Sequence, residues 1–77
     1  MPHYYFDVRD GDRLIRDDTG LELPSIDIAR AEVARCLAET ARDVLPGKVR
    51  REIAIEARDD SRPLFRAVLL FGIEDFA

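Results

Sequence analysis

Residues 4–12 read Tyr-Tyr-Phe-Asp-Val-Arg-Asp-Gly-Asp, and this stretch decides how the fold begins. Alternate side chains of an extended strand point to the same face, so the apolar side chains of this stretch share one face. They are Tyr4, Phe6 and Val8. The Asp10-Gly11 pair that follows tolerates the positive φ angles of a tight hairpin turn. We therefore predict a strand over residues 3–9, a turn, and a second strand over residues 13–17.

A single long helix is predicted after this hairpin. Residues 17–20, Asp-Asp-Thr-Gly, favour a turn, residues 21–23 form a short extended link, and Pro24 stands just before the helix. Ser25 is a suitable N-cap, because its hydroxyl can accept a hydrogen bond from an amide of the first turn. Pro46-Gly47 ends the helix. Apolar and small residues recur between these limits at helical spacing and form one stripe: Ala29, Val33, Cys36, Leu37, Thr40, Ala41 and Val44.

Two further strands are predicted over residues 51–58 and 64–73. The whole pattern is ββαββ, an α+β fold in which one long helix packs on one face of a four-stranded antiparallel sheet. A length of 77 residues allows one domain, residues 1–77. The inward face of the last strand carries large apolar side chains. Truncation of Leu69 or Phe71 to alanine is therefore expected to be among the costly changes.

The last predicted strand is apolar on both faces, although a sheet with one helix needs only one apolar face. One interpretation is an interior strand that exposes a few single aliphatic side chains, which is common. The other is an apolar patch that a second chain covers. The sequence leaves both interpretations open. The predicted interface residues are Tyr5, Ala54, Arg66, Val68 and Leu70.

Few side chains could carry chemistry. Five aspartates cluster around the hairpin: Asp7, Asp10, Asp12, Asp17 and Asp18. Such carboxylates can bind Mg²⁺ or Ca²⁺, but their spacing is not that of a calcium loop, and interleaved arginines favour turn and solubility roles. His3 has no obvious catalytic partner, and Cys36 lies on the apolar helix stripe, where a thiol behaves as a small hydrophobe. We expect no enzymatic activity, no catalytic residue, and no cofactor, metal or small-molecule ligand.

Composition limits the environment and the partners. The chain carries 12 Lys and Arg against 16 Asp and Glu, a net charge of −4, which weighs against a nucleic-acid partner. One cysteine excludes an internal disulfide and suits a reducing compartment. The chain shows neither the pattern of a signal peptide nor a run of apolar residues long enough to span a membrane. These features predict a cytoplasmic protein without a membrane partner.

Three segments point to a family: M-P-H-Y-Y-F-D-V-R-D-G at residues 1–11, D-D-T-G-L-E-L-P at 17–24, and R-E-I-A-I-E-A-R-D-D at 51–60. The chain resembles a family of short proteobacterial proteins known only as a domain of unknown function. The resemblance covers nearly the whole chain and implies a small bacterial domain, with no activity or catalytic residue to transfer. At the level of fold, the order of hairpin, turn and helix is also similar to HicB-type antitoxins, but no DNA-binding segment follows the sheet here.

The function predicted from these observations is a non-enzymatic protein-interaction module that self-associates through its sheet as a homodimer or docks on another protein. The alternative is an RNA-binding or antitoxin-like regulatory module. It would use the main basic residues, which are Arg50, Arg51, Arg58 and Arg66.

Overall fold

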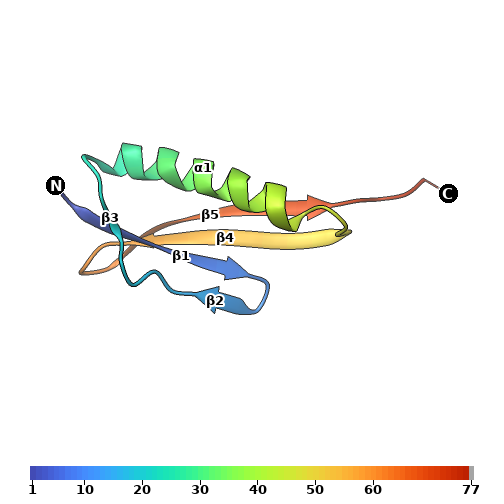
Figure 1. Ribbon diagram of the computed structural model, residues 1–77, viewed down its shortest axis with the longest axis horizontal. Coiled ribbons are helices and arrows are strands. Elements are labelled where there is room, and N and C mark those ends of the chain that lie inside the picture. Colours follow the sequence, from blue (N-terminus) through green and yellow to red (C-terminus); the bar gives the residue numbers. More distant parts are fainter. Residues whose placement is uncertain (77) are drawn as a thin grey trace.

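The protein, described by a computed structural model over residues 1–76, places one helix against one face of an antiparallel sheet (Figure 1). The strands are β1 (His3–Asp10), β2 (Arg13–Ile15), β3 (Leu21–Glu22), β4 (Arg50–Arg58) and β5 (Pro63–Gly72), and the helix is α1 (Ile26–Val44). The strand order is β2-β1-β4-β5, and β3 adds to β1 beyond the end of β2. The predicted α+β class is confirmed. The link at residues 21–23 contributes an additional short strand.

The β1–β2 hairpin turns where the sequence predicted it, with Gly11 at a φ of 61° and Asp10 opposite Arg13. However, β2 ends at Ile15, two residues earlier than expected. The strand ends there because Asp17 bonds to β1 through a side chain in each direction. Its amide donates to Asp7 Oδ1 at 2.9 Å, and its own carboxylate accepts the Phe6 amide at 3.0 Å. A side chain thereby replaces the backbone ladder on this part of β1, and the chain leaves the sheet until β3.

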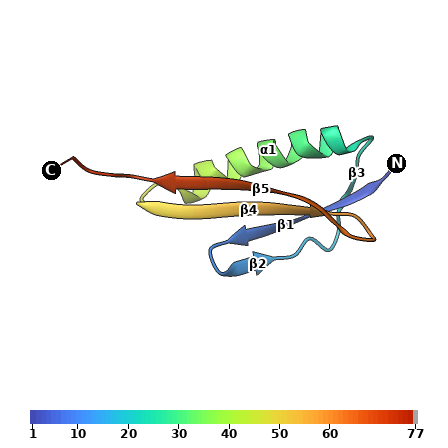
Figure 2. The same ribbon diagram turned by 180° about the vertical axis from the view of Figure 1, so that it is seen from behind.

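The helix begins and ends as predicted. Ser25 Oγ accepts the Ile28 amide at 3.3 Å, which confirms the N-cap, and Gly47 follows the helix at a φ of 87°. The stripe is confirmed at its centre, because α1 buries Ala29, Val33 and Leu37 against the sheet. Figure 2 shows the helix from behind, lying lengthwise along β4 and β5.

The core lies between α1 and the central strand β4. Its most buried large side chains are Ile53 and Ile55 of β4 and Val33 of α1. By contrast, Leu69 and Phe71 are only half-buried. The sequence therefore placed these two residues too deep in the core. The reason is that β5 lies at the edge of the sheet, so its inward side chains have a neighbouring strand on one side alone.

Candidate interaction surface

The β5 strand forms one long edge of the sheet, so its interpretation as an interior strand is wrong. It pairs with β4 from Pro63 to Gly72, with one irregularity opposite Ala57 and Arg58. Just beyond β5, the Ile73 amide donates to the Val49 carbonyl at 2.9 Å. Because backbone groups of an antiparallel strand alternate in direction, the N–H and C=O groups at even positions from Arg66 to Gly72 point away from β4. We call residues 66–72 the free edge.

The free edge carries exposed apolar side chains on the face of the sheet opposite α1, which we call the uncovered face. Val68 is 44% exposed and Leu70 is 74% exposed, although both lie within a regular strand. The chain then continues beyond the sheet with Ile73 at 47% and Phe76 at 101% exposure. Unpaired backbone groups and exposed aliphatic side chains together are the features by which an edge strand pairs with another chain.

The opposite edge of the sheet also exposes aliphatic side chains, Leu14 at 41% and Ile15 at 48%, but it is much shorter. There β2 is only three residues long, and Arg13 and Arg16 stand at its two ends. Short edge strands and basic side chains are devices that prevent edge-to-edge pairing. On β5 the corresponding devices are Pro63, the irregularity beside it and Arg66, all of which lie in its first half. Residues 67–72 have none.

The structure separates the five residues predicted for the interface. Val68 and Leu70 are exposed neighbours on the free edge, and Arg66 lies beside them on the same face. Ala54, between Arg9 and Val68 in the sheet, is only 1% exposed and offers almost no surface. Tyr5 lies two strands away on β1, below the guanidinium of Arg58. The surface that the structure brings together is therefore centred on β5.

The most buried charge belongs to a cluster that sequence reasoning missed. Asp7 is 6% exposed on the uncovered face, where its Oδ2 accepts Arg58 Nε at 2.9 Å. Arg58 also donates to the Asp17 carbonyl at 3.0 Å and stacks 4.5 Å from the centre of the Tyr5 ring. Burial by itself would raise the pKa of Asp7, but the hydrogen bonds from Arg58 and the Asp17 amide outweigh it and lower that pKa. This cluster fastens the loop after β2 to the sheet.

The same loop depends on a close approach at Gly20. The Asp17 Oδ1 atom accepts the Thr19 and Gly20 amides at 3.1 and 3.0 Å. Gly20 has a φ of 72°, and a Cβ atom there would lie 2.8 Å from the Tyr4 carbonyl oxygen and would clash with the His3 ring. Asp17 and Gly20 thus have backbone roles, as the turn interpretation of the aspartates predicted.

Asp10 and several of the basic residues also form ion pairs. Arg51 binds Asp10 through two bonds of 2.7 Å, and Arg66 Nε lies 3.3 Å from Glu56. With the Arg58–Asp7 pair, three of the four arginines proposed to bind RNA are engaged with carboxylates within the chain. Among residues 1–76, no group of three or more acidic, His or Cys side chains is arranged to hold a metal ion.

Cys36 and His3 both have polar neighbours within the chain. The pKa of Cys36 is raised by burial and by its hydrogen bond to Glu32, so the thiol is less reactive than a free one. His3 Nε2 lies 2.9 Å from the Thr19 carbonyl oxygen, and its ring lies beside that of Tyr5. Within the described chain, no helix is both long and apolar enough to cross a bilayer.

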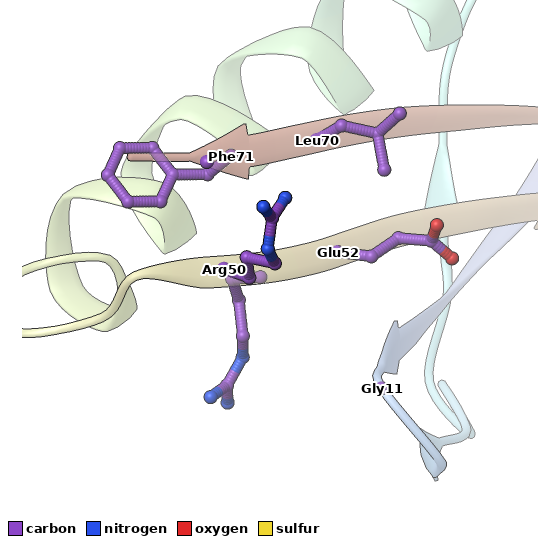
Figure 3. Close-up of a pocket in the computed structure, with 7 residues that line it drawn as sticks. Gly11, Arg50, Glu52, Leu70 and Phe71 are labelled. Atoms are coloured by element: carbon purple, nitrogen blue, oxygen red, sulfur yellow. The ribbon is translucent and has the colours of Figure 1, made fainter. Parts of the chain in front are cut away.

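Two open pockets, each of about 550 Å³, flank the free edge near its end. The first lies between the ends of β4 and β5 and includes Leu70, Arg50 and Glu52 (Figure 3). The second lies on the other side of the sheet, where Ala38 and Ala41 of α1 face Phe71 and Ile73. The residues of both pockets include Phe71, so the apolar surface is continuous around the edge.

Fold and surface define a class: over the residues described, a small α+β protein with one helix on an antiparallel sheet, one short sheet edge and one long edge with exposed apolar side chains. Comparison with protein families gives the particular assignment. Residues 3–70 match the family described as Domain of unknown function (DUF6894), and the chain belongs to that family. Neither the curated proteins nor the solved structures include a significant match. The resemblance to a family of unknown function is confirmed.

Proposed function

We propose that this protein is a non-enzymatic interaction module that self-associates by adding β5 of one chain to β5 of a second. The observation that carries the proposal is the contrast between the two sheet edges. The β2 edge exposes Leu14 and Ile15 but is only three residues long and flanked by arginines, whereas residues 67–72 of β5 form a longer run of unpaired backbone groups with exposed Val68 and Leu70.

A second copy is a natural occupant of this edge because antiparallel pairing is self-complementary. Two identical strands related by a twofold axis present the same surface to each other, as in most homodimers. The small size of the chain adds a reason, since a 77-residue domain buries a limited fraction of its apolar surface. Pairing at β5 would cover Leu70 and satisfy the outward backbone groups. The proposed cellular location is the cytoplasm, in keeping with the single free cysteine.

The test is the oligomeric state of the full chain by sedimentation equilibrium at micromolar concentrations. We expect a dimer, and we expect Leu70→Asp to convert it to a monomer because the substitution places a carboxylate in the proposed interface. Glu22→Lys, an exposed change on β3, is the control and should leave the dimer intact. A wild-type chain that sediments as a monomer throughout, or a dimer that survives Leu70→Asp, would overturn the proposal.

A further inference from the structure

The inference that follows rests on the proposed function and concerns how the two copies align. Beyond β5 the chain does not turn back but continues in the direction of the strand, as Figures 1 and 2 both show. Residues 73–76 carry two exposed apolar side chains, Ile73 and Phe76, and two acidic ones, Glu74 and Asp75. Glu74 forms no ion pair within the part of the chain that the structure describes.

The pleat of the sheet restricts the possible alignments. Directly opposite residues of an antiparallel pair point to the same face, so a residue of the uncovered face must lie opposite another of that face. A twofold axis then passes through a pair of identical residues. The candidates near the middle of the exposed surface are Leu69, Leu70 and Phe71, each facing its own copy.

Charge distinguishes these three alignments. Centring on Leu69 places Arg66 opposite Gly72 of the second copy, and centring on Phe71 places it opposite Phe76. Centring on Leu70 places Arg66 opposite Glu74 of the second copy, and by symmetry Glu74 opposite Arg66. Arg66 lies on the uncovered face, and Glu74, two residues beyond the end of β5, takes the same face when the strand pleat continues through Ile73 in the paired state. Arg66 already contacts Glu56 within its own chain, and only this alignment adds an acidic residue directly opposite it across the junction.

The same alignment suits the apolar residues. Leu70, the most exposed apolar side chain of any strand, lies opposite its own copy. On the other face Ile73 falls opposite Ala67, whose side chain is small. The paired stretch is residues 66–74, which allows about ten backbone hydrogen bonds between the copies, because each outward residue can both donate and accept.

The helices leave room for this arrangement. Neighbouring strands lie about 4.8 Å apart, so the two β4 strands of the joined sheet would be about 14 Å apart. Because α1 packs more on β4 than on β5, the separation of the two helix axes would be somewhat less than this spacing. Packed helices lie about 8–10 Å apart, so the two helices would come near each other without overlapping. The flank of α1 beside this edge carries small residues, Ala38 and Ala41, next to Phe71.

We propose that residues 66–74 of two copies pair antiparallel about Leu70, with Arg66 of each chain bound to Glu74 of the other. Residues 73–76 are then part of the dimer interface, and the sheet becomes continuous across both chains.

The test compares two charge reversals of the same kind on adjacent residues, Glu74→Arg and Asp75→Arg, in the full chain. Glu74→Arg puts two arginines together at each end of the junction, and the dimer dissociation constant should rise about tenfold or more. Asp75→Arg makes the same change in net charge on the opposite face and should alter it by less than about threefold. The double variant Arg66→Glu/Glu74→Arg restores an opposite-charge pair across the junction and should recover part of the affinity, because the new carboxylate at position 66 also faces Glu52 and Glu56 of its own chain. Thermal melting of each variant checks that the monomer remains folded.

Each result separates the alignment from the proposed function. Preferential weakening by Glu74→Arg with rescue in the double variant supports the alignment. Equal effects of Glu74→Arg and Asp75→Arg, in a dimer that Leu70→Asp still dissociates, overturn the alignment but leave self-association through β5 in place. A wild-type monomer overturns both.

Discussion

Replacing Asp7 by alanine should destabilise this protein more than any other single loss of a carboxylate. The Asp7 side chain is 8% exposed and that of Arg58 is 25% exposed. Without Asp7, the Arg58 guanidinium loses its acidic partner in a partly buried site, and the Asp17 amide loses its acceptor. Breaking a buried ion pair from one side costs about 3–5 kcal/mol, and the partial exposure of Arg58 places this loss at the lower end of that range.

This cost is large relative to the whole. A chain of 77 residues has a free energy of unfolding of roughly 4–12 kcal/mol, so Asp7→Ala should remove about a quarter of it or more. Urea denaturation followed by circular dichroism measures the loss. Asp18→Ala is the matched control, because Asp18 is an exposed aspartate in the same loop, and its cost should stay within about 0.5 kcal/mol.

A double variant tests the cause. In Asp7→Ala/Arg58→Met the unpaired guanidinium is gone, so the loss should be smaller than the sum of the two single losses by about 0.5–3 kcal/mol. An Asp7→Ala protein within about 1 kcal/mol of the wild type, or strictly additive losses, would refute the view that this pair anchors the loop.

Three further predictions concern pH, backbone and core. Hydrogen bonds lower the pKa values of several carboxylates, among them those of Asp7, Asp10 and Asp17. Since the folded pKa values lie below the unfolded value of about 3.9, these carboxylates contribute their full stability above about pH 5 and lose it as the pH falls through the folded values. The Tm should therefore be nearly constant from neutral pH to about pH 5 and drop below about pH 4. A Tm that stays constant down to low pH would contradict the hydrogen-bonded positions of these carboxylates. Gly20→Ala should lower stability well beyond Gly47→Ala, because both sites have positive φ but only at Gly20 would a Cβ atom meet neighbouring atoms; equal melting temperatures would exclude the close approach. Ile53→Ala should cost about 2–5 kcal/mol and Leu69→Ala less, because only Ile53 is enclosed on all sides; the reverse order in chemical denaturation would show that the core is misplaced.

Local sequence signals predicted the elements of this fold well. The alternating aromatic residues of β1, the Asp10-Gly11 turn, the Ser25 cap and the Pro46-Gly47 stop all act within a few residues of chain. Their physical causes, which are side-chain alternation, tolerance of positive φ and hydrogen bonding of orphan amides, need no distant partner. The two-sided apolar character of residues 64–73 likewise marked the segment that later proved to be the candidate surface.

Other properties depend on partners far along the chain. The Asp7–Arg58 pair joins residues that are 51 positions apart, and nothing near either residue marks it as buried. The early end of β2 has the same origin, because Asp17 bonds to β1 rather than continuing the ladder. The acidic residues near the hairpin suggested solubility, and only their three-dimensional neighbours show that Asp7 and Asp10 pair with arginines of β4.

The amino-acid sequence alone determined that this chain has one amphipathic helix between two pairs of strands, because periodicity and capping are local properties. The tertiary structure decided that β4 is central and β5 is at the edge, since the order of strands depends on which backbone hydrogen bonds form between distant segments. That order turns the apolar strand from a candidate core element into an edge with free backbone groups. It also explains why Ile53 and Ile55, rather than Leu69 and Phe71, are enclosed.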